Sequence, residues 1–231
     1  MRTAAIVCLA AAAGAWTLGG CELAADRPAV MKAPTQAVSE LVLPTEKTGP
    51  TVTEKDFVMN WLVLGPITFG ESDFGGGHQQ PAADHAFLKG EGNLDGSQPA
   101  PPGAAWQEKR FAGNGQDGQV DLDALYNGAE HAAAYAVAWL KCPREVRDAK
   151  LCVGSDDYIK VWINGKLVHT YKTERRAGTP DQDVVGGIRL NQGYNRVVVK
   201  CVDVVLGWNF YFRLSGAEGR PIAVQAVAGT K

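Results

Sequence analysis

The sequence has no excess of positive charge. Its 231 residues include 23 Lys and Arg against 25 Asp and Glu, which gives a formal net charge of −2. Proteins that bind nucleic acid usually neutralise a row of phosphates with a surplus of basic side chains. We therefore expect no nucleic-acid partner.

Cysteine is also scarce, with five residues in the chain and no Cys-x-x-Cys pair. The missing pair removes the common signature of zinc sites and of thioredoxin-like redox centres. Cys142, Cys152 and Cys201 lie beyond the N-terminal segment, and their spacing alone does not decide whether two of them form a disulfide. We expect buried free thiols, because two of the three stand in β-like runs where a small hydrophobe would serve.

Motifs of catalysis are missing as well. The sequence contains no Gly-x-Ser-x-Gly elbow and no phosphate-binding loop, and no evident pair of glycosidase carboxylates. We therefore expect no enzymatic activity. A small polysaccharide hydrolase or lyase is the alternative, and it would need two titratable groups that converge in one pocket.

An apolar stretch, residues 3–18, stands near the start and is too short to span a bilayer comfortably. Arg2 precedes it, which is the pattern of a secretory signal. The stretch ends in Leu-Gly-Gly-Cys21, which resembles the lipobox of bacterial lipoproteins. The resemblance implies that residues 1–20 are a signal peptide and that Cys21 carries the lipid.

This reading predicts an exported protein that a lipid anchor holds in the bacterial envelope, because two or more acyl chains attach stably to a membrane. Glu22, rather than Asp, follows the cysteine, and this favours the outer membrane. Simple secretion with cleavage near Ala25 is the alternative.

Composition divides the remaining chain into three parts. Residues 21–55 have scattered prolines, few aromatic residues and no sustained period, which is typical of a disordered tether. Aromatic and β-branched residues become frequent from residue 56, and we expect a folded domain over 56–221. Residues 222–231 are expected to form a C-terminal tail.

The sequence predicts an all-β domain over 56–221. After a Gly- and Pro-rich stretch over 71–106 that must be mostly loop, short β-like runs recur with turn residues between them. This spacing predicts an antiparallel β-sandwich. Residues 129–140, AEHAAAYAVAWL, are ambiguous, because the alanines favour a helix whereas alternate large residues favour a buried strand.

Two local patterns predict specific geometry. Asn164-Gly165 between β-branched runs is a strong hairpin signal, because a type I′ turn needs positive φ at both central residues. Further on, Val197, Val199 and Cys201 alternate along one run, so their side chains share one face of a strand. We expect that face to lie in the core.

The segment GSDDYIKVWINGKLV, together with GYNRVVVK and GWNFYFRL, resembles the galactose-binding-domain-like β-sandwiches. It is also similar to the lectin-like sandwich named after anthrax protective antigen. The resemblance covers about residues 56–221 and implies a jelly roll. It is informative about the fold and much less about the activity, because this scaffold carries binders, spacers and enzyme appendages alike.

Sugar-binding members of the second group coordinate calcium with paired aspartates, and Asp156 and Asp157 match those positions. The resemblance therefore implies Ca²⁺ at Asp156 and Asp157, which would supply hard oxygen ligands. Tyr158 departs from the pattern, because the relatives usually have glycine there. The alternative is that both acids only hold a turn by bonding backbone amides.

Further ligand-binding candidates are aromatic, amide and basic. Tyr158 could stack on a sugar ring, and Trp162 and Trp208 stand beside turns where exposed rings would serve the same purpose. Asn164 is a candidate oxygen ligand, and Arg175 with Arg176 could bond a polar or anionic glycan. For each of these residues packing or solvation is the alternative.

These observations favour a non-catalytic carbohydrate-binding module on a lipid-anchored envelope protein, with a glycan or polysaccharide as its partner and with assistance from calcium. A structural lipoprotein that docks an envelope protein is the alternative. It would show an exposed apolar patch rather than a polar site.

Overall fold

The structure is a computed structural model that describes residues 56–112, 117–216, 218–219, 222 and 225–227. The predicted signal peptide over 1–20, the lipid attachment at Cys21 and the tether over 21–55 lie outside the described residues. None of the helices in the described ranges has the length and apolar character that a membrane crossing requires.

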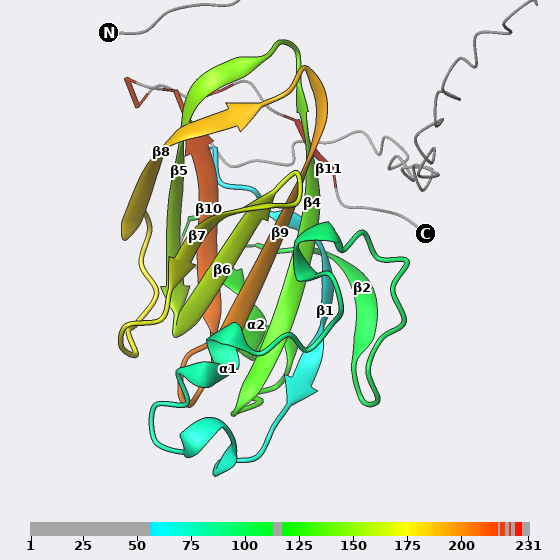
Figure 1. The fold of residues 1–231 in the computed structure, drawn as a ribbon, viewed down its shortest axis with the longest axis vertical. Coiled ribbons are helices and arrows are strands. Elements are labelled where there is room, and N and C mark those ends of the chain that lie inside the picture. Colours follow the sequence, from blue (N-terminus) through cyan, green and yellow to red (C-terminus); the bar gives the residue numbers. More distant parts are fainter. Residues whose placement is uncertain (1–55, 113–116, 217, 220–221, 223–224, 228–231) are drawn as a thin grey trace, which may run out of the picture. The chain divides into compact units, whose positions relative to one another are not determined.

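Two antiparallel sheets face each other, which confirms the predicted β-sandwich (Figure 1). The larger sheet has the spatial order β2 (Ala105–Arg110), β1 (Asn60–Thr68), β4 (Ala132–Cys142), β9 (Gly193–Asp203), β6 (Tyr158–Ile163) and β7 (Lys166–Tyr171), and β11 (Gln225–Val227) also pairs with β4. The smaller sheet has the order β3 (Val120–Asp121), β10 (Asn209–Ser215), β5 (Val146–Asp156) and β8 (Asp183–Leu190).

The chain passes repeatedly from one sheet to the other. It crosses from β4 to β5, returns to β6, and crosses again at β7 to β8, β8 to β9 and β9 to β10. Strand β11 lies beyond the domain boundary predicted at residue 221. The crossings bring three connections together at the lower end of the sheets in Figure 1: the β5–β6 junction, the β7–β8 loop and the β9–β10 loop.

The ambiguous alanine-rich segment forms β4, the strand between β1 and β9. Its alternate alanines face the second sheet, whereas Tyr135, Val137 and Trp139 face the opposite side. A strand with two buried faces needs apolar residues at every position, and small residues on one face let the sheets approach closely. Tertiary packing thus overrides the helix propensity of alanine.

The core between the sheets confirms the alternation predicted on β9. Val197, Val199 and Cys201 all belong to this core. Cys142, Cys152 and Cys201 are free and buried, as expected. The hairpin between β6 and β7 is also confirmed, with φ of 53° at Asn164 and 81° at Gly165.

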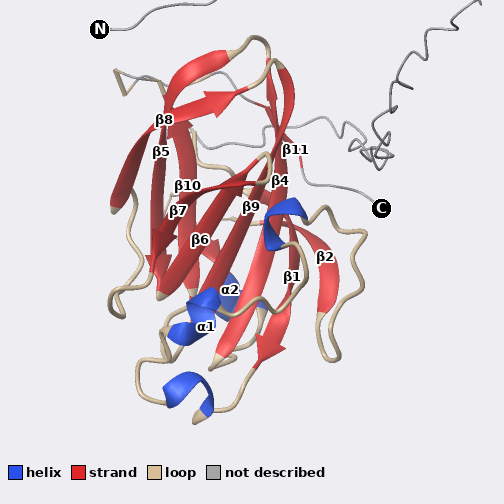
Figure 2. Cartoon of the chain, viewed as in Figure 1, coloured by secondary structure: helices blue, strands red, loops and turns tan. Residues whose placement is uncertain are grey.

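The segment between β1 and β2, residues 69–104, packs on the outer face of the larger sheet. We call it the loop layer, because it makes a third layer over the two sheets. It carries the short helix α1 (Pro81–Asp84) and two 3-10 helices, Asp73–Gly75 and Glu91–Asn93. Helix α1 lies against β6 and β9 (Figure 2). Apolar residues of this loop close a second hydrophobic cluster, which includes Ala82, Ala83 and Leu94. The glycine- and proline-rich composition therefore predicted a loop correctly but gave no sign of this packing.

A buried lysine fixes the loop layer to the sheet. Lys200 on β9 donates to the carbonyl oxygens of Ala83 at 3.0 Å and His85 at 2.5 Å, and to Glu91 Oε1 at 3.1 Å. The Tyr135 hydroxyl donates to the same Glu91 oxygen at 2.5 Å. Burial lowers the pKa of Lys200, and the charge of Glu91 opposes this. The three acceptors satisfy the ammonium group, so this charged contact is a structural one.

Candidate functional site

Asp156 and Asp157 lie at a corner between the two sheets. The chain does not reverse within one sheet at this point: β5 ends at Asp156 in the smaller sheet and β6 begins at Tyr158 in the larger one. The peptide bond between the two aspartates is cis. Asp157 N donates to Val202 O on β9 at 3.1 Å, so the connection is tied to the larger sheet at once.

The Asp157 side chain points inward and is 1% exposed. Its carboxylate accepts the Val204 amide at 3.0 Å and the Arg175 Nε at 3.3 and 3.4 Å, and the amide of Arg176 also donates to it. Burial raises the pKa of Asp157, and these donors hold it down. Asp157 therefore ties the β7–β8 and β9–β10 loops to the corner.

The Asp156 side chain is partly exposed and has a different environment. Burial, followed by the neighbouring charge of Asp157, raises the pKa of Asp156 to about 7, although the Gly178 amide donates to it. Gly207 approaches it closely, because a β-carbon there would lie 2.6 Å from Asp156 Oδ2. Near neutral pH this carboxyl is present in both protonation states, so it can both donate and accept a hydrogen bond.

Asp203, at the end of β9, is a third acid of this site and was not predicted. It is 1% exposed, and neither carboxylate oxygen has a hydrogen-bond partner among the described residues. Burial, then the charges of Asp157, Glu130 and Asp156, raise the pKa of Asp203 to about 8. A signal was present, because Asp203 continues the core-facing alternation of Val199 and Cys201. We call Asp156, Asp157 and Asp203 the acidic corner.

Leu206 stands exposed beside the acidic corner. Its side chain is 78% exposed, and its φ is 82°, a left-handed value that is strained for leucine. Both carboxylate oxygens of Glu130 accept its amide, at 2.9 and 3.2 Å. Strained residues that their surroundings hold in place often mark functional contacts. The sequence gave no signal for this residue, since a leucine between valine and glycine is unremarkable in a β protein.

The predicted aromatic contact surfaces are wrong, because all three rings are buried. Tyr158 is 0% exposed and donates to His78 O at 2.5 Å beneath the loop layer. Trp162 lies under Gly92 of the same layer. Trp208 is 0% exposed and packs against Tyr126 with ring centroids 5.3 Å apart. None of these rings can stack on a sugar without moving part of the fold.

The side chains of Asn164 and Arg176 do not join the acidic corner either. Asn164 lies at the far end of β6, about 20 Å from Asp157 at the usual rise of a strand. Arg176 bonds Asp183 at 2.5 and 3.2 Å and lies over the ring of Tyr171. Its side chain therefore anchors the β7–β8 loop to β8, and of the two predicted arginine side chains only that of Arg175 bonds an aspartate of the corner, whereas Arg176 contributes its main-chain amide to Asp157.

The acidic corner does not fit a metal ion as it stands. Across the described part of the chain, no three Asp, Glu, His or Cys side chains are grouped so that they could hold one. Ca²⁺ takes six to eight oxygens, and the oxygens of Asp157 are already engaged by Val204 and Arg175. The calcium at Asp156 and Asp157 that the resemblance implies stays a prediction.

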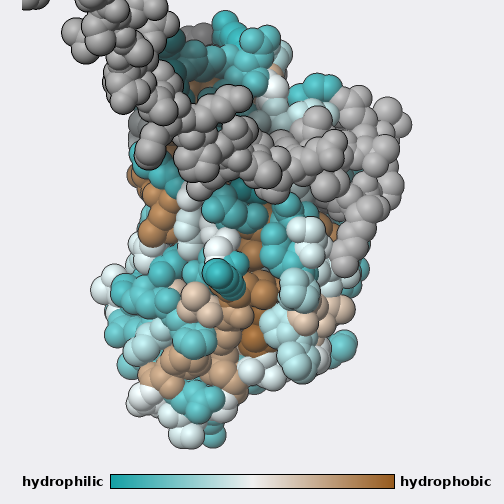
Figure 3. Space-filling view, turned by 45° about the vertical axis from the view of Figure 1, so that its right-hand side comes forward, coloured by the Kyte–Doolittle hydropathy of each residue, from teal (hydrophilic) through white to brown (hydrophobic). Residues whose placement is uncertain are grey.

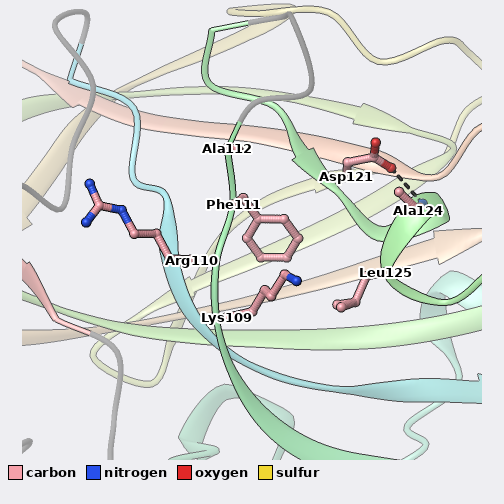
Figure 4. A pocket seen from close by; sticks show the side chains of 7 residues that line it. All are labelled: Lys109, Arg110, Phe111, Ala112, Asp121, Ala124 and Leu125. Atoms are coloured by element: carbon pink, nitrogen blue, oxygen red, sulfur yellow. Dashed lines mark hydrogen bonds between the residues drawn. The ribbon is translucent and has the colours of Figure 1, made fainter.

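A pocket of about 260 Å³ lies between the end of β2 and helix α2 (Leu122–Leu125). Phe111, Leu125 and Lys109 line it (Figure 4), with Asp121 at one side, where its carboxylate caps the helix through the Ala124 amide. None of the predicted site residues lines this pocket.

No family model matches the chain, and no curated protein matches it. Among solved structures, the chain is similar to the PA14 domain of the MpAFP antifreeze protein, at 15% identity over 75% of each chain with a TM-score of 0.34. It is also similar to a β-glucosidase from Kluyveromyces marxianus, at 10% identity over 77% of this chain and 19% of that one with a TM-score of 0.40.

A β-glycosidase from Bacteroides vulgatus is 14% identical over 73% of this chain and 20% of that one, with a TM-score of 0.37. This chain thus spans about a fifth of the length of the two enzymes. Similarity at these scores assigns neither a family nor an activity to the chain.

Proposed function

We propose that the protein is a non-catalytic carbohydrate-binding module whose ligand contacts the rim of the acidic corner. The observation that supports this most is the combination of a strained, exposed Leu206 with the partly exposed carboxyl of Asp156. Sugars present hydroxyl groups beside apolar C–H faces, so a binding surface needs polar and apolar groups side by side.

Each exposed group has a role in this proposal. Asp156 donates to or accepts from a sugar hydroxyl, because its pKa of about 7 leaves both states populated near neutral pH. The Arg175 side chain keeps 28% of its surface exposed and supplies a donor. Leu206 covers an apolar face of the sugar ring, in place of the aromatic rings that the fold has buried.

The site is shallow, and affinity should therefore be modest. Hydroxyl groups exchange bonds with water for bonds with protein, and the net gain per bond is only about 1 kcal/mol. The rim offers a few such bonds and one leucine. We expect dissociation constants in the range of about 0.1 to 1 mM for a single sugar unit, which corresponds to about −4 to −5.5 kcal/mol.

A glycan array tests the proposal. The full chain is compared with Asp156→Ala and Asp157→Ala in calcium and in EDTA, and Asp148→Ala, an exposed acid on β5, serves as the matched control. We expect a glycan that binds the wild type and the control and that Asp156→Ala loses. Asp157→Ala must first be shown to fold, because Asp157 ties two loops together. Failure to bind any glycan would overturn the proposal.

The exposed apolar side chains do not favour a protein-docking function. The large hydrophobic residues exposed within the described ranges are Leu167, Val184 and Leu206, and they come from β7, β8 and the β9–β10 loop. On the face shown in Figure 3, hydrophobic residues gather near the centre and below it, and hydrophilic residues border them. Because the exposed large hydrophobic side chains come from three different elements, we place the envelope-protein partner behind the carbohydrate proposal.

The enzyme alternative has partial support only. Asp156, Asp157 and Asp203 all have raised pKa values. However, Asp157 and Asp203 are each 1% exposed, so neither can touch a substrate in this conformation. Turnover of a polysaccharide that Asp156→Ala abolishes would replace the binding proposal with a catalytic one.

The anchor is proposed separately. We propose that Cys21 is lipidated and holds the domain at the outer membrane through the 21–55 tether, as the lipobox-like motif implies. Metabolic labelling with a radioactive fatty acid should mark the wild type and not Cys21→Ser, whereas Cys8→Ser should still be labelled. Recovery of an unlabelled wild-type protein from the soluble fraction would refute the anchor.

A further inference from the structure

The pocket between the end of β2 and helix α2 has an apolar floor and a charged rim (Figure 4). Phe111 is 6% exposed and Leu125 packs against the core between the sheets, so these two side chains form the floor. Lys109 and Ala124 are exposed and stand at the rim. A cavity of about 150 Å³ is large enough for a benzene ring. The volume of about 260 Å³ therefore has room for a ring that carries one small substituent.

The register of β2 explains why a lysine faces this pocket. Lys109 pairs with Trp61 of β1, and Trp61 belongs to the core between the two sheets. Cross-strand partners share one face of a sheet, so the Lys109 side chain lies on the core-facing side. Arg110 pairs with Asn60, and its side chain points away from the pocket (Figure 4). Because β2 is the edge strand of the larger sheet, Lys109 reaches the rim of the sandwich.

The ammonium group of Lys109 has no partner of its own. Within the described ranges its side chain is in no hydrogen bond or ion pair, and the bond drawn in Figure 4 joins the Ala124 amide to Asp121 Oδ1 at 2.9 Å. An inward-pointing charge on an edge strand discourages pairing with another chain, but this purpose does not require a pocket beside the charge. An unpaired cation over an apolar floor favours an anion with an apolar body.

We propose that this pocket binds a small organic acid with an apolar body, namely an aromatic carboxylate. The carboxylate accepts hydrogen bonds from Lys109 Nζ, and the ring lies on Phe111 and Leu125. Asp121 repels a second negative charge at its side of the pocket, which directs the acid group toward Lys109. The pocket shares no side chain with the acidic corner, so the organic acid is a second ligand beside the proposed glycan.

The pocket and the acidic corner nevertheless lie at the same end of the smaller sheet. Asp121 on β3 pairs with Asn209 on β10, and Asn209 pairs with Asp156 on β5. Two strand spacings separate Asp121 from Asp156 along this row, which corresponds to about 10 Å. The two sites are neighbours with separate side chains, so each can be tested without the other.

Calorimetry and thermal unfolding of the full chain with three probes test the site. Benzoate has the ring and the charge, benzamide has the ring without the charge, and acetate has the charge without a ring. We expect benzoate to bind with a dissociation constant of about 1 mM and to raise Tm, because a ligand of the folded state stabilises it. Benzamide and acetate should each bind about fivefold more weakly than benzoate or less well still.

Substitutions at the rim identify the groups involved. Lys109→Gln should weaken benzoate binding about fivefold and leave benzamide binding unchanged, because only the charge is lost. Ala124→Leu should weaken the binding of both, because the larger side chain fills part of the pocket. Arg110→Gln is the matched control, since it removes a charge that points away from the pocket, and it should bind benzoate as the wild type does. All three positions are exposed, so these variants should fold.

Four results would overturn the proposal. The first is no binding of benzoate at about 20 mM, well above the expected dissociation constant. The second is equal binding of benzoate and benzamide by the wild type, and the third is unchanged benzoate binding by Lys109→Gln. The fourth is an equal loss in Arg110→Gln and Lys109→Gln, which would show a general attraction of anions to surface charge.

The same probe separates this site from the proposed function. Asp156→Ala is expected to lose the glycan, and it should bind benzoate as the wild type does, because Asp156 does not line the pocket. Benzoate binding without glycan binding by any variant would keep this site and overturn the proposed function. Glycan binding without benzoate binding would do the reverse.

Discussion

Replacing Asp203 with asparagine should stabilise the protein, which is the reverse of most substitutions in a buried region. The side chain is 1% exposed, and its two oxygens have no hydrogen-bond partner in the described ranges. A buried carboxyl without donors opposes folding, because it must lose water or take up a proton. Asp203→Asn keeps the shape and removes the ionisation.

The size of the effect follows from the pKa. Burial and the charges of Asp157, Glu130 and Asp156 raise the pKa of Asp203 from 3.8 to about 8, and the charge of Arg175 opposes them. At pH 7 this difference corresponds to an upper limit of about 4 kcal/mol against the folded state. The buried amide costs about 1–3 kcal/mol in turn. We expect a net gain of about 1–3 kcal/mol, or about 5 °C in Tm.

The gain should depend on pH in a definite direction. Between the unfolded pKa of 3.8 and the folded pKa of about 8, the folded state holds more protons at Asp203 than the unfolded state does. Stability of the wild type therefore falls as pH rises through this range. Asp156 adds a slope of the same sign to both proteins, so the difference between them reports Asp203 together with its coupling to the neighbouring acids.

Urea denaturation followed by circular dichroism, in EDTA at pH 5 and pH 8, measures this difference. Asp148→Asn, an exposed acid on β5, is the control and should leave the stability unchanged. A variant that is less stable than the wild type at pH 8 would show that the carboxylate receives donors in the folded protein. An equal gain at both pH values would also refute the electrostatic reasoning.

Three further substitutions test other parts of the structure. Lys200→Met leaves the partly buried Glu91 without its cation and should cost about 3–5 kcal/mol in denaturant unfolding. Glu91→Gln added to the same chain should recover part of this stability, and a cost below about 1 kcal/mol would contradict the role of this contact. Leu206→Gly should change stability by less than about 1 kcal/mol, because glycine relieves the positive φ. It should weaken glycan binding about fivefold, because the apolar contact is lost. Unchanged affinity would show that Leu206 does not contact the ligand. Trp208→Ala should lower stability by about 3–5 kcal/mol, because the ring is buried. A variant that keeps full stability and loses only glycan binding would show that the ring contacts the ligand instead.

Local patterns in the sequence were sufficient for much of the fold. Asn164-Gly165 fixed one hairpin because its turn type needs positive φ, and the Val197–Cys201 alternation identified the core face of β9. The alanine-rich segment could not be decided locally. Its strand state depends on β1 and β9, which pair with it from distant parts of the chain.

The site was less predictable, because its contacts join three separate connections. Asp157 and Arg175, both predicted for the ligand site, are in contact, but the acids stand at a crossing between sheets that no local pattern indicated. Tyr158 and Trp162 looked like surface rings because no sequence pattern indicated that the 69–104 loop would cover them. The β9 alternation placed Asp203 on the core-facing side, but the sequence did not show that its buried oxygens would lack donors.

The loop layer also limits how this domain can be combined with others. A bare outer sheet is a broad apolar face on which a neighbouring module or a second copy could stack. Here the 69–104 segment occupies the part of that face around β6 and β9, and Lys200 holds it there by three hydrogen bonds. Any assembly that needs a flat surface on these strands must first displace this segment and break that charged contact.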